Sequence, residues 1–139
     1  MLKGLKKIKG IEKYLILPEH LPGSEPSWFG FPITVKQNQA FNKIDLVKFL
    51  ESNNIGTRHL FAGNILRQPA ILNSEIKLRI RNSGILKSTD LSESNYKMLP
   101  NTDTVMNSTF WVGIWPGIIK KEIDLILNKI EEFVTFNKI

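Results

Sequence analysis

Hydrophobic residues recur along the chain at two spacings, and the change from one to the other predicts where strands and helices lie. Three short apolar segments bounded by polar or Pro/Gly-rich stretches are typical of strands, at 14–19 (YLILPE), 28–36 (WFGFPITVK) and 57–61 (TRHLF). Pro32 predicts that the second is an edge strand or carries a bulge, because proline has no N–H to donate. The segment 109–115 (TFWVGIW) is apolar on both faces, which predicts a central strand.

Other segments repeat at the spacing of an amphipathic helix. In 41–56 (FNKIDLVKFLESNNIG), Asn42 and Asp45 have the spacing of a capping box, and Gly56 is expected to end the segment in a left-handed conformation. The segment 119–134 carries a full apolar stripe. The apolar positions are Leu2, Leu5 and Ile8 in a short repeat at the start, Leu46, Val47 and Leu50 in the second helix, and Ile119, Ile123, Ile126, Leu127, Ile130, Phe133 and Val134 in the last.

The pattern is weaker between these well-marked segments. Residues 76–81 (IKLRIR) alternate and predict a strand, 83–96 (SGILKSTDLSESNY) read as a polar surface excursion, and 101–108 (NTDTVMNS) predict a short capped helix. Strands and helices thus alternate along the chain. The expected fold is an α/β two-layer sandwich, in which a small, mainly antiparallel sheet carries helices on one face.

Composition restricts the chemistry that the chain can perform. Its 139 residues are most simply one domain, and 42% hydrophobic and 23% charged residues are ordinary for a globular protein. There is no cysteine, and there are only two histidines, His20 and His59, so we expect no metal site and no cysteine nucleophile. No apolar run has the length of a membrane span, and the basic start lacks a signal-peptide pattern, so we expect a cytoplasmic location.

The net charge of +6 permits attraction to phosphates. Five lysines fall within the first thirteen residues, and we favour a solvated helix face for them. No aromatic residues interleave with these lysines as a groove for single-stranded nucleic acid requires, so nucleic acid is not the expected partner. A stand-alone basic binding or interaction module remains the alternative.

The richest polar chemistry lies in 58–69 (RHLFAGNILRQP), directly after a predicted strand. Arg58 and Arg67 present guanidinium groups that suit a carboxylate or a phosphate, Asn64 offers a donor and an acceptor, and Gly63 would let a ligand approach the backbone. This combination of residues is typical of a loop that binds an anion or a sugar. It is equally typical of two ordinary ion-pairing arginines with an asparagine that closes a turn, and both interpretations stay open at this point.

Four longer motifs occur in a distinctive order: ILPEHLPGSEPSWFGFPITV, IGTRHLFAGNILRQP, NTDTVMNSTFWVGIWPG and IDLILNKIEEF. Together they resemble the C-terminal part of the DegT/DnrJ/EryC1/StrS family of pyridoxal-phosphate sugar aminotransferases and dehydratases. The nearest branch by resemblance is the sugar-nucleotide 3-dehydratases of lipopolysaccharide dideoxysugar synthesis. The resemblance extends over nearly the whole chain and is weakest at 72–99.

This resemblance implies the small domain of a type I aminotransferase fold. Residues 1–13 would be a remnant of the interdomain linker helix, and 14–139 the C-terminal small domain. The large domain, which holds pyridoxal or pyridoxamine phosphate and the catalytic lysine or histidine, would precede it. We therefore expect no catalytic residue and no bound cofactor in this chain alone, which would be an inactive fragment, a truncated gene product or one piece of a split enzyme.

The resemblance also implies roles for the polar loop. Arg58 would hold an anionic group of the cosubstrate or nucleotide sugar, and Asn64 and Arg67 would position the sugar or its diphosphate. His59 and Gln68 would shape the loop. Asp103 is better interpreted as a first-turn helix carboxylate than as a catalyst. The implied partners are a nucleotide sugar, the missing large domain or a split partner chain, and a second copy of the chain.

One segment departs from the family pattern. After WPG the family usually opens its last helix with a hydroxyl residue followed by acids, whereas this chain has IIKKE. Ile119 has no side-chain acceptor for a cap, and Lys120 and Lys121 oppose the helix dipole. A gene product that no longer functions would accumulate unfavourable substitutions of this kind. A nonfunctional truncated remnant is therefore a further alternative.

Overall fold

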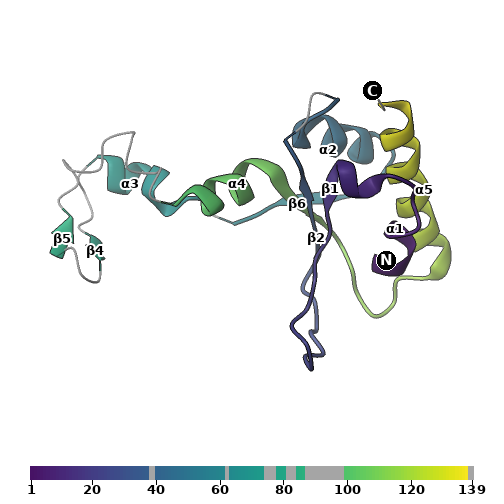
Figure 1. Ribbon diagram of the computed structural model, residues 1–139, viewed down its shortest axis with the longest axis horizontal. Helices are drawn as coiled ribbons and strands as arrows, with labels where there is room; N and C mark the ends of the chain where they lie inside the picture. Colours follow the sequence, from purple (N-terminus) through teal and green to yellow (C-terminus); the bar gives the residue numbers. More distant parts are fainter. Residues whose placement is uncertain (38–39, 62, 74–77, 81–83, 87–98, 138–139) are drawn as a thin grey trace. The chain divides into compact units, whose positions relative to one another are not determined.

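The computed structural model describes residues 1–37, 40–61, 63–73, 78–80, 84–86 and 99–137 (Figure 1). The chain divides into two compact units. One comprises Met1–His59 with Ser108–Ile139 and is called the sheet unit, and the other comprises Leu60–Asn107 and is called the insert unit. Each is described by itself.

A four-stranded antiparallel sheet forms the centre of the sheet unit. Its strands are β1 (Leu15–Ile16), β2 (Phe31–Val35), β3 (Thr57–His59) and β6 (Thr109–Val112), in the spatial order β1-β2-β6-β3. The predicted α/β fold with a small antiparallel sheet is confirmed. The predicted central position of the last strand is also confirmed, because β6 pairs with β2 on one side and with β3 on the other.

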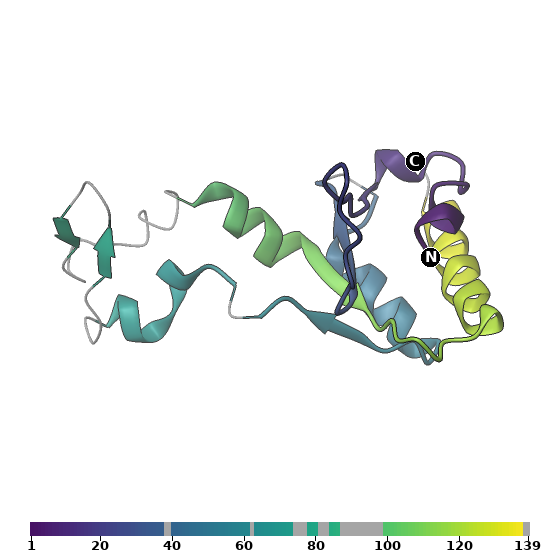
Figure 2. The same cartoon turned by 90° about the horizontal axis from the view of Figure 1, so that it is seen from below.

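Helices cover one face of this sheet. They are α1 (Leu2–Leu5), the 3-10 turn η1 (Ile11–Lys13), α2 (Lys43–Ser52) and α5 (Lys120–Phe136), and in both views α1 and α2 lie beside α5 (Figures 1 and 2). Along β2, buried residues alternate with half-buried ones. One face of the strand therefore packs in the core under the helices, and the other face is partly exposed. The shared core is made of Leu5, Ile8, Ile11, Leu15, Phe31, Ile33, Val35, Phe41, Leu46, Val47, Leu50, Ile55, Phe110, Val112, Ile126, Ile130, Phe133 and Val134.

The N-terminus of α2 has the predicted capping box. The Asn42 side chain accepts hydrogen bonds from the N–H groups of Ile44 (2.8 Å) and Asp45 (3.2 Å). In return, the Asp45 carboxylate accepts from the Asn42 N–H at 2.9 Å. These contacts satisfy N–H groups that have no partner within the helix.

The predicted end of α2 at Gly56 is wrong. The left-handed residue is Asn54 (φ 59°), two positions earlier. The N–H of Asn54 donates to Glu51 and that of Ile55 to Leu50, which is the Schellman pattern. Asparagine tolerates this conformation, and the early turn buries Ile55 beside Leu50 in the core.

The expectation that Pro32 marks an edge strand or a bulge was wrong, since the register of β2 with β6 runs unbroken from Phe31 to Thr34. Strand β2 lies between β1 and β6, so it is not an edge strand. The ladder with β1 nevertheless reaches only Thr34 and Val35, and Pro32 pairs with Trp111 of β6 alone. The missing N–H of Pro32 therefore removes no hydrogen bond from the β1 ladder.

The insert unit contains η2 (Ile65–Arg67), α3 (Pro69–Leu72), the antiparallel pair β4 (Leu78–Ile80) and β5 (Gly84–Leu86), and most of α4 (Pro100–Ser108). The predictions of a strand in 76–81 and a helix in 101–108 are confirmed where the structure describes them. The surface excursion predicted for 83–96 contains β5 (Gly84–Leu86), and all its other residues lie outside the described residues. None of the helices in the described ranges is long and apolar enough to cross a membrane.

Candidate functional site

The predicted loop residues are divided between the two units. Arg58 and His59 belong to β3 of the sheet unit, and both are exposed. Gly63, Asn64, Arg67 and Gln68 belong to the insert unit, where Asn64 precedes η2 and Gln68 lies between η2 and α3.

Arg58 lies on the sheet face turned away from the helices. It pairs in register with Trp111 of β6, and its Nη1 donates to the carbonyl of Thr57 at 2.9 Å. Arg58 forms no ion pair with any carboxylate in the part of the chain that the structure describes. An exposed guanidinium with only a backbone acceptor keeps donors available for an anion.

A pocket of about 190 Å³ opens beside Arg58. The rings of Phe29 and Trp111 contact each other there, with centroids 4.7 Å apart and planes at 40°. Gly30 makes this packing possible, because a Cβ at that position would overlap the indole of Trp111. The pocket is lined by Phe29, Gly30, Arg58, Trp111, Val112 and Gly113. Sequence reasoning missed Phe29 and Trp111, and only the cross-strand register places Trp111 opposite Arg58.

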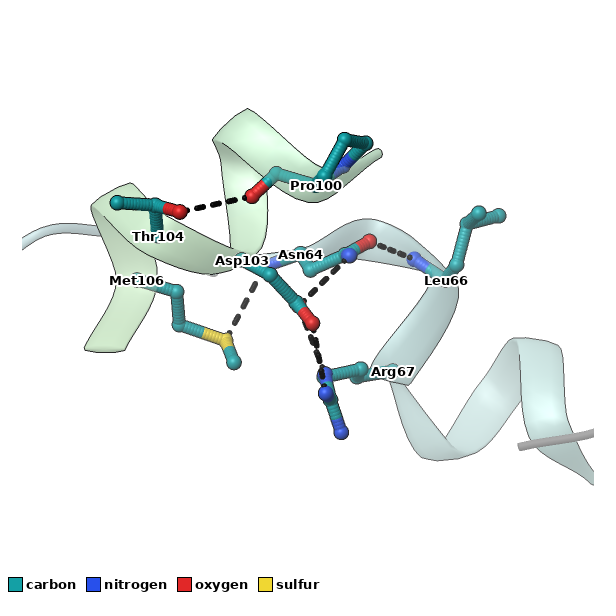
Figure 3. Close-up of polar contacts among 7 residues, drawn as sticks. All are labelled: Asn64, Leu66, Arg67, Pro100, Asp103, Thr104 and Met106. Atoms are coloured by element: carbon teal, nitrogen blue, oxygen red, sulfur yellow. Dashed lines mark hydrogen bonds and ion pairs between the residues drawn. The ribbon is translucent and has the colours of Figure 1, made fainter. Parts of the chain in front are cut away.

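Asn64 has a different environment from Arg58. Its side chain is fully buried in the insert unit, and both ends of its amide are engaged (Figure 3). The Oδ1 accepts from the N–H of Leu66 at 3.0 Å, which caps η2, and the Nδ2 donates to Oδ1 of Asp103 at 2.9 Å. Asn64 therefore connects the turn to helix α4.

Arg67 makes a two-point ion pair with the same carboxylate. Its Nε donates to Oδ1 of Asp103 at 2.8 Å and its Nη2 donates to Oδ2 at 2.7 Å (Figure 3). The hydrogen bond from Arg67 is the main reason that the pKa of Asp103 lies below its ordinary value, and the hydrogen bond from Asn64 lowers this pKa further. We call these contacts of Asn64, Arg67 and Asp103 the Asp103 clamp.

Gly63 is held against the same helix. It has a left-handed backbone (φ 63°), and a Cβ at this position would overlap the side chain of Met106. The N–H of Asn64 donates to the Met106 sulfur at 3.3 Å (Figure 3). The face of Gly63 that lacks a Cβ is thus filled by the protein itself.

The geometry separates the two interpretations that the sequence left open. Asn64 and Arg67 fit the structural one, since they close a turn and form an ion pair. Arg58 fits the ligand-binding one. Asp103 does lie in the first turn of α4, as expected, but its pairing was not foreseen, because 36 and 39 residues separate it from Arg67 and Asn64. In the described ranges, no group of three His, Asp or Glu residues could hold a metal ion.

One protein family matches most of this chain. A sequence model of the DegT/DnrJ/EryC1/StrS aminotransferase family matches residues 3–131. The lipopolysaccharide biosynthesis protein RfbH of Salmonella typhimurium is 42% identical over 130 residues, which are 94% of this chain and 26% of the relative. The dTDP-4-dehydro-2,6-dideoxy-D-glucose 3-dehydratase of Saccharopolyspora spinosa is 42% identical over 132 residues, which are 95% of this chain and 24% of that enzyme.

The fold is also that of a solved structure. The E. coli GDP-4-keto-6-deoxy-D-mannose-3-dehydratase, solved with bound hydrated PLP, is similar with a TM-score of 0.62 at 18% identity. The match covers 94% of this chain and 28% of the enzyme. The chain therefore spans about a quarter of the length of the curated relatives it matches.

Proposed function

The chain belongs to the DegT/DnrJ/EryC1/StrS aminotransferase family, and from this premise we propose the function of its whole protein. The chain is the C-terminal domain of a cytoplasmic nucleotide-sugar dehydratase or aminotransferase of lipopolysaccharide or deoxysugar biosynthesis. Support comes from two relatives at 42% identity, one named for lipopolysaccharide biosynthesis and the other for a dTDP-sugar 3-dehydratase. A large domain, on the same chain or on another, completes the enzyme, and the complete enzyme is a homo-oligomer.

The observation that carries the proposal is the environment of Arg58. An exposed guanidinium beside a pocket with an aromatic wall suits an anionic group attached to a ring. Arg58 binds a phosphate of the nucleotide sugar or a carboxylate of a cosubstrate, and the Phe29–Trp111 pair excludes water from one side of it. His59 lies next to Arg58 at the end of β3 and shapes the approach.

The insert unit contributes a turn of fixed shape. Asn64, Gly63 and Gln68 set the backbone path of this turn, and the two-point ion pair with Asp103 holds the Arg67 side chain against α4. The buried amide of Asn64 acts through the turn rather than by direct contact, because both of its ends are engaged.

The cofactor is assigned to the large domain. The Arg58 pocket does not fit the pyridine ring, since its six lining residues include no lysine or histidine to act as base and no carboxylate to pair with the ring nitrogen. Pyridoxal or pyridoxamine phosphate, held by the large domain, supplies the electron sink for chemistry at the sugar. The residues of this chain bind and orient the substrate.

Complementation tests the proposal. The chain is mixed with a separately expressed cofactor-binding domain of a curated relative, and conversion of a dTDP- or GDP-linked 4-keto sugar is followed by mass spectrometry. We expect turnover only in the mixture, and a strong loss with Arg58→Ala but not with Lys48→Ala, which removes the same charge from an exposed position of α2. If the two domains bind each other but no sugar is converted, the proposal is wrong.

A further inference from the structure

The pocket beside Arg58 has a wall that is more apolar than a phosphate requires. The rings of Phe29 and Trp111 form this wall, and Phe29 is 78% exposed. We propose that this pair, called the Phe29–Trp111 wall, receives the hexose of the nucleotide sugar and selects a hexose with a methyl group at C6 over one with a hydroxyl there. This inference rests on the proposed function, because it takes a phosphate of the nucleotide sugar as the group that Arg58 binds.

The size of the pocket limits how much of the ligand it can hold. Its volume of about 190 Å³ is that of six water molecules at roughly 30 Å³ each, and pockets that enclose a whole ligand have roughly 300–1,000 Å³. One sugar ring therefore enters it, and the rest of the nucleotide lies outside. Because Arg58 and Phe29 line the same small cavity, the ring that meets the wall is one bonded to the phosphate on Arg58. The hexose and the ribose are such rings, whereas the base is one ring further away.

The polarity of the lining decides which group of the sugar fits. Apart from Arg58, the pocket is lined by two aromatic residues, a valine and two glycines. The Nε1 of Trp111 is buried, so the indole presents carbon atoms to the pocket. A hydroxyl group against this wall gives up water without gaining a side-chain partner there, whereas a methyl group has no hydrogen bond to lose. The C6 methyl of a 6-deoxyhexose is therefore the group of the two sugar rings that fits the wall best.

The wall is held in place by the sheet. Trp111 pairs in register with Pro32 of β2 on one side and with Arg58 of β3 on the other, and its indole packs against Gly30. The centroids of Phe29 and Trp111 lie 4.7 Å apart, a separation that is usual for interacting aromatic rings. An indole fixed in this way cannot turn its N–H toward a hydroxyl group, so the wall remains apolar when a sugar binds.

The expected selectivity is moderate. A hydrophobic pocket rejects a ligand that merely adds a hydroxyl group by about a hundredfold at most. The pocket beside Arg58 is open to solvent at Phe29, so water reaches part of a bound hydroxyl group. We therefore expect a preference of about tenfold for the C6 methyl, below that upper limit.

The experiment measures the affinity of the 139-residue chain by NMR titration with two probes, dTDP-6-deoxy-D-glucose and dTDP-D-glucose, which differ only in the C6 hydroxyl. We expect wild type to bind the deoxy compound about tenfold more tightly. Phe29→Ala should bind the two probes equally, and this change leaves the core intact because Phe29 is outside it. The control Phe136→Ala removes another exposed ring, at the end of α5, and should keep the wild-type preference. Equal affinity of wild type for both probes overturns the proposal.

A second measurement identifies the ring that occupies the pocket. The deoxy probe carries two methyl groups, one at C6 of the hexose and one on the thymine base. A proton above the face of an aromatic ring resonates at higher field, so a methyl group that lies against the wall shifts upfield on binding. We expect this shift for the C6 methyl, and its loss in Phe29→Ala. An upfield shift of the thymine methyl alone, or of neither methyl, would show that the wall does not receive the hexose, and the proposal would be wrong.

Failure of the inference can be distinguished from failure of the proposed function. Arg58→Ala should weaken the binding of both probes by a similar factor, because each carries the same diphosphate. If Arg58→Ala weakens both but wild type does not prefer the deoxy probe, only the selectivity is lost. If wild type binds neither probe, or Arg58→Ala binds both as tightly as wild type, the proposed function fails and the inference fails with it.

Discussion

Gly30 provides a direct test of how the pocket beside Arg58 is built. The residue is buried in the segment before β2, and a Cβ there would overlap the six-membered ring of the Trp111 indole. Gly30→Ala must therefore displace the indole or move the strand. Overpacking of this kind costs about 1–3 kcal/mol in the free energy of unfolding. For a chain of 139 residues we expect the melting temperature to fall by several degrees, on the order of 3–4 °C per kcal/mol.

Gly113 is the matched control, because it lines the same pocket and a Cβ added there would meet no other atom within 4 Å. Gly113→Ala should change stability by no more than about 0.5 kcal/mol. Thermal unfolding followed by circular dichroism measures both, and tryptophan fluorescence reports the displaced indole. In a Trp111→Ala background the added methyl of Gly30→Ala meets no ring, so its cost should nearly vanish in a double-mutant cycle. If Gly30→Ala costs as much in that background as in wild type, the steric explanation is wrong.

Three further predictions follow from the helix ends and the Asp103 clamp. At the start of α5, the side chain of Glu122 accepts the N–H of Ile119 at 3.1 Å, and Ile119 itself has no side-chain acceptor for a cap. The double change Ile119→Thr with Lys120→Glu should therefore raise the free energy of unfolding by about 1 kcal/mol. An unchanged melting temperature would refute this. Asn42→Ala should cost about 1 kcal/mol in chemical denaturation, since two N–H groups of α2 lose their acceptor. The pKa of Asp103 is lowered in the folded chain, so its contribution to stability is present above its ordinary value of 3.8 and lost as the pH falls further. Amide exchange in the insert unit should therefore quicken in acid for wild type, and much less for Asp103→Asn.

Much of the sheet unit was predictable because its signals are local. The capping box at Asn42 depends on two side chains that are three residues apart in the sequence. The central position of the strand at 109–112 was indicated by a continuous run of apolar residues. The end of α2 was not predictable from the glycine alone. Asn54 takes the left-handed position because that turn lets Ile55 enter the core, and the core is made by distant segments.

For the candidate site, the order of four sequence motifs was enough to identify the family and to locate a polar turn with two arginines. It could not decide what each arginine does. That depends on partners brought together by tertiary contacts: Arg67 meets Asp103 across 36 residues, whereas Arg58 faces Trp111 through strand register and meets no described carboxylate. A guanidinium is equally suited to a protein carboxylate and to a ligand anion, so only the folded chain shows which of the two arginines is already paired.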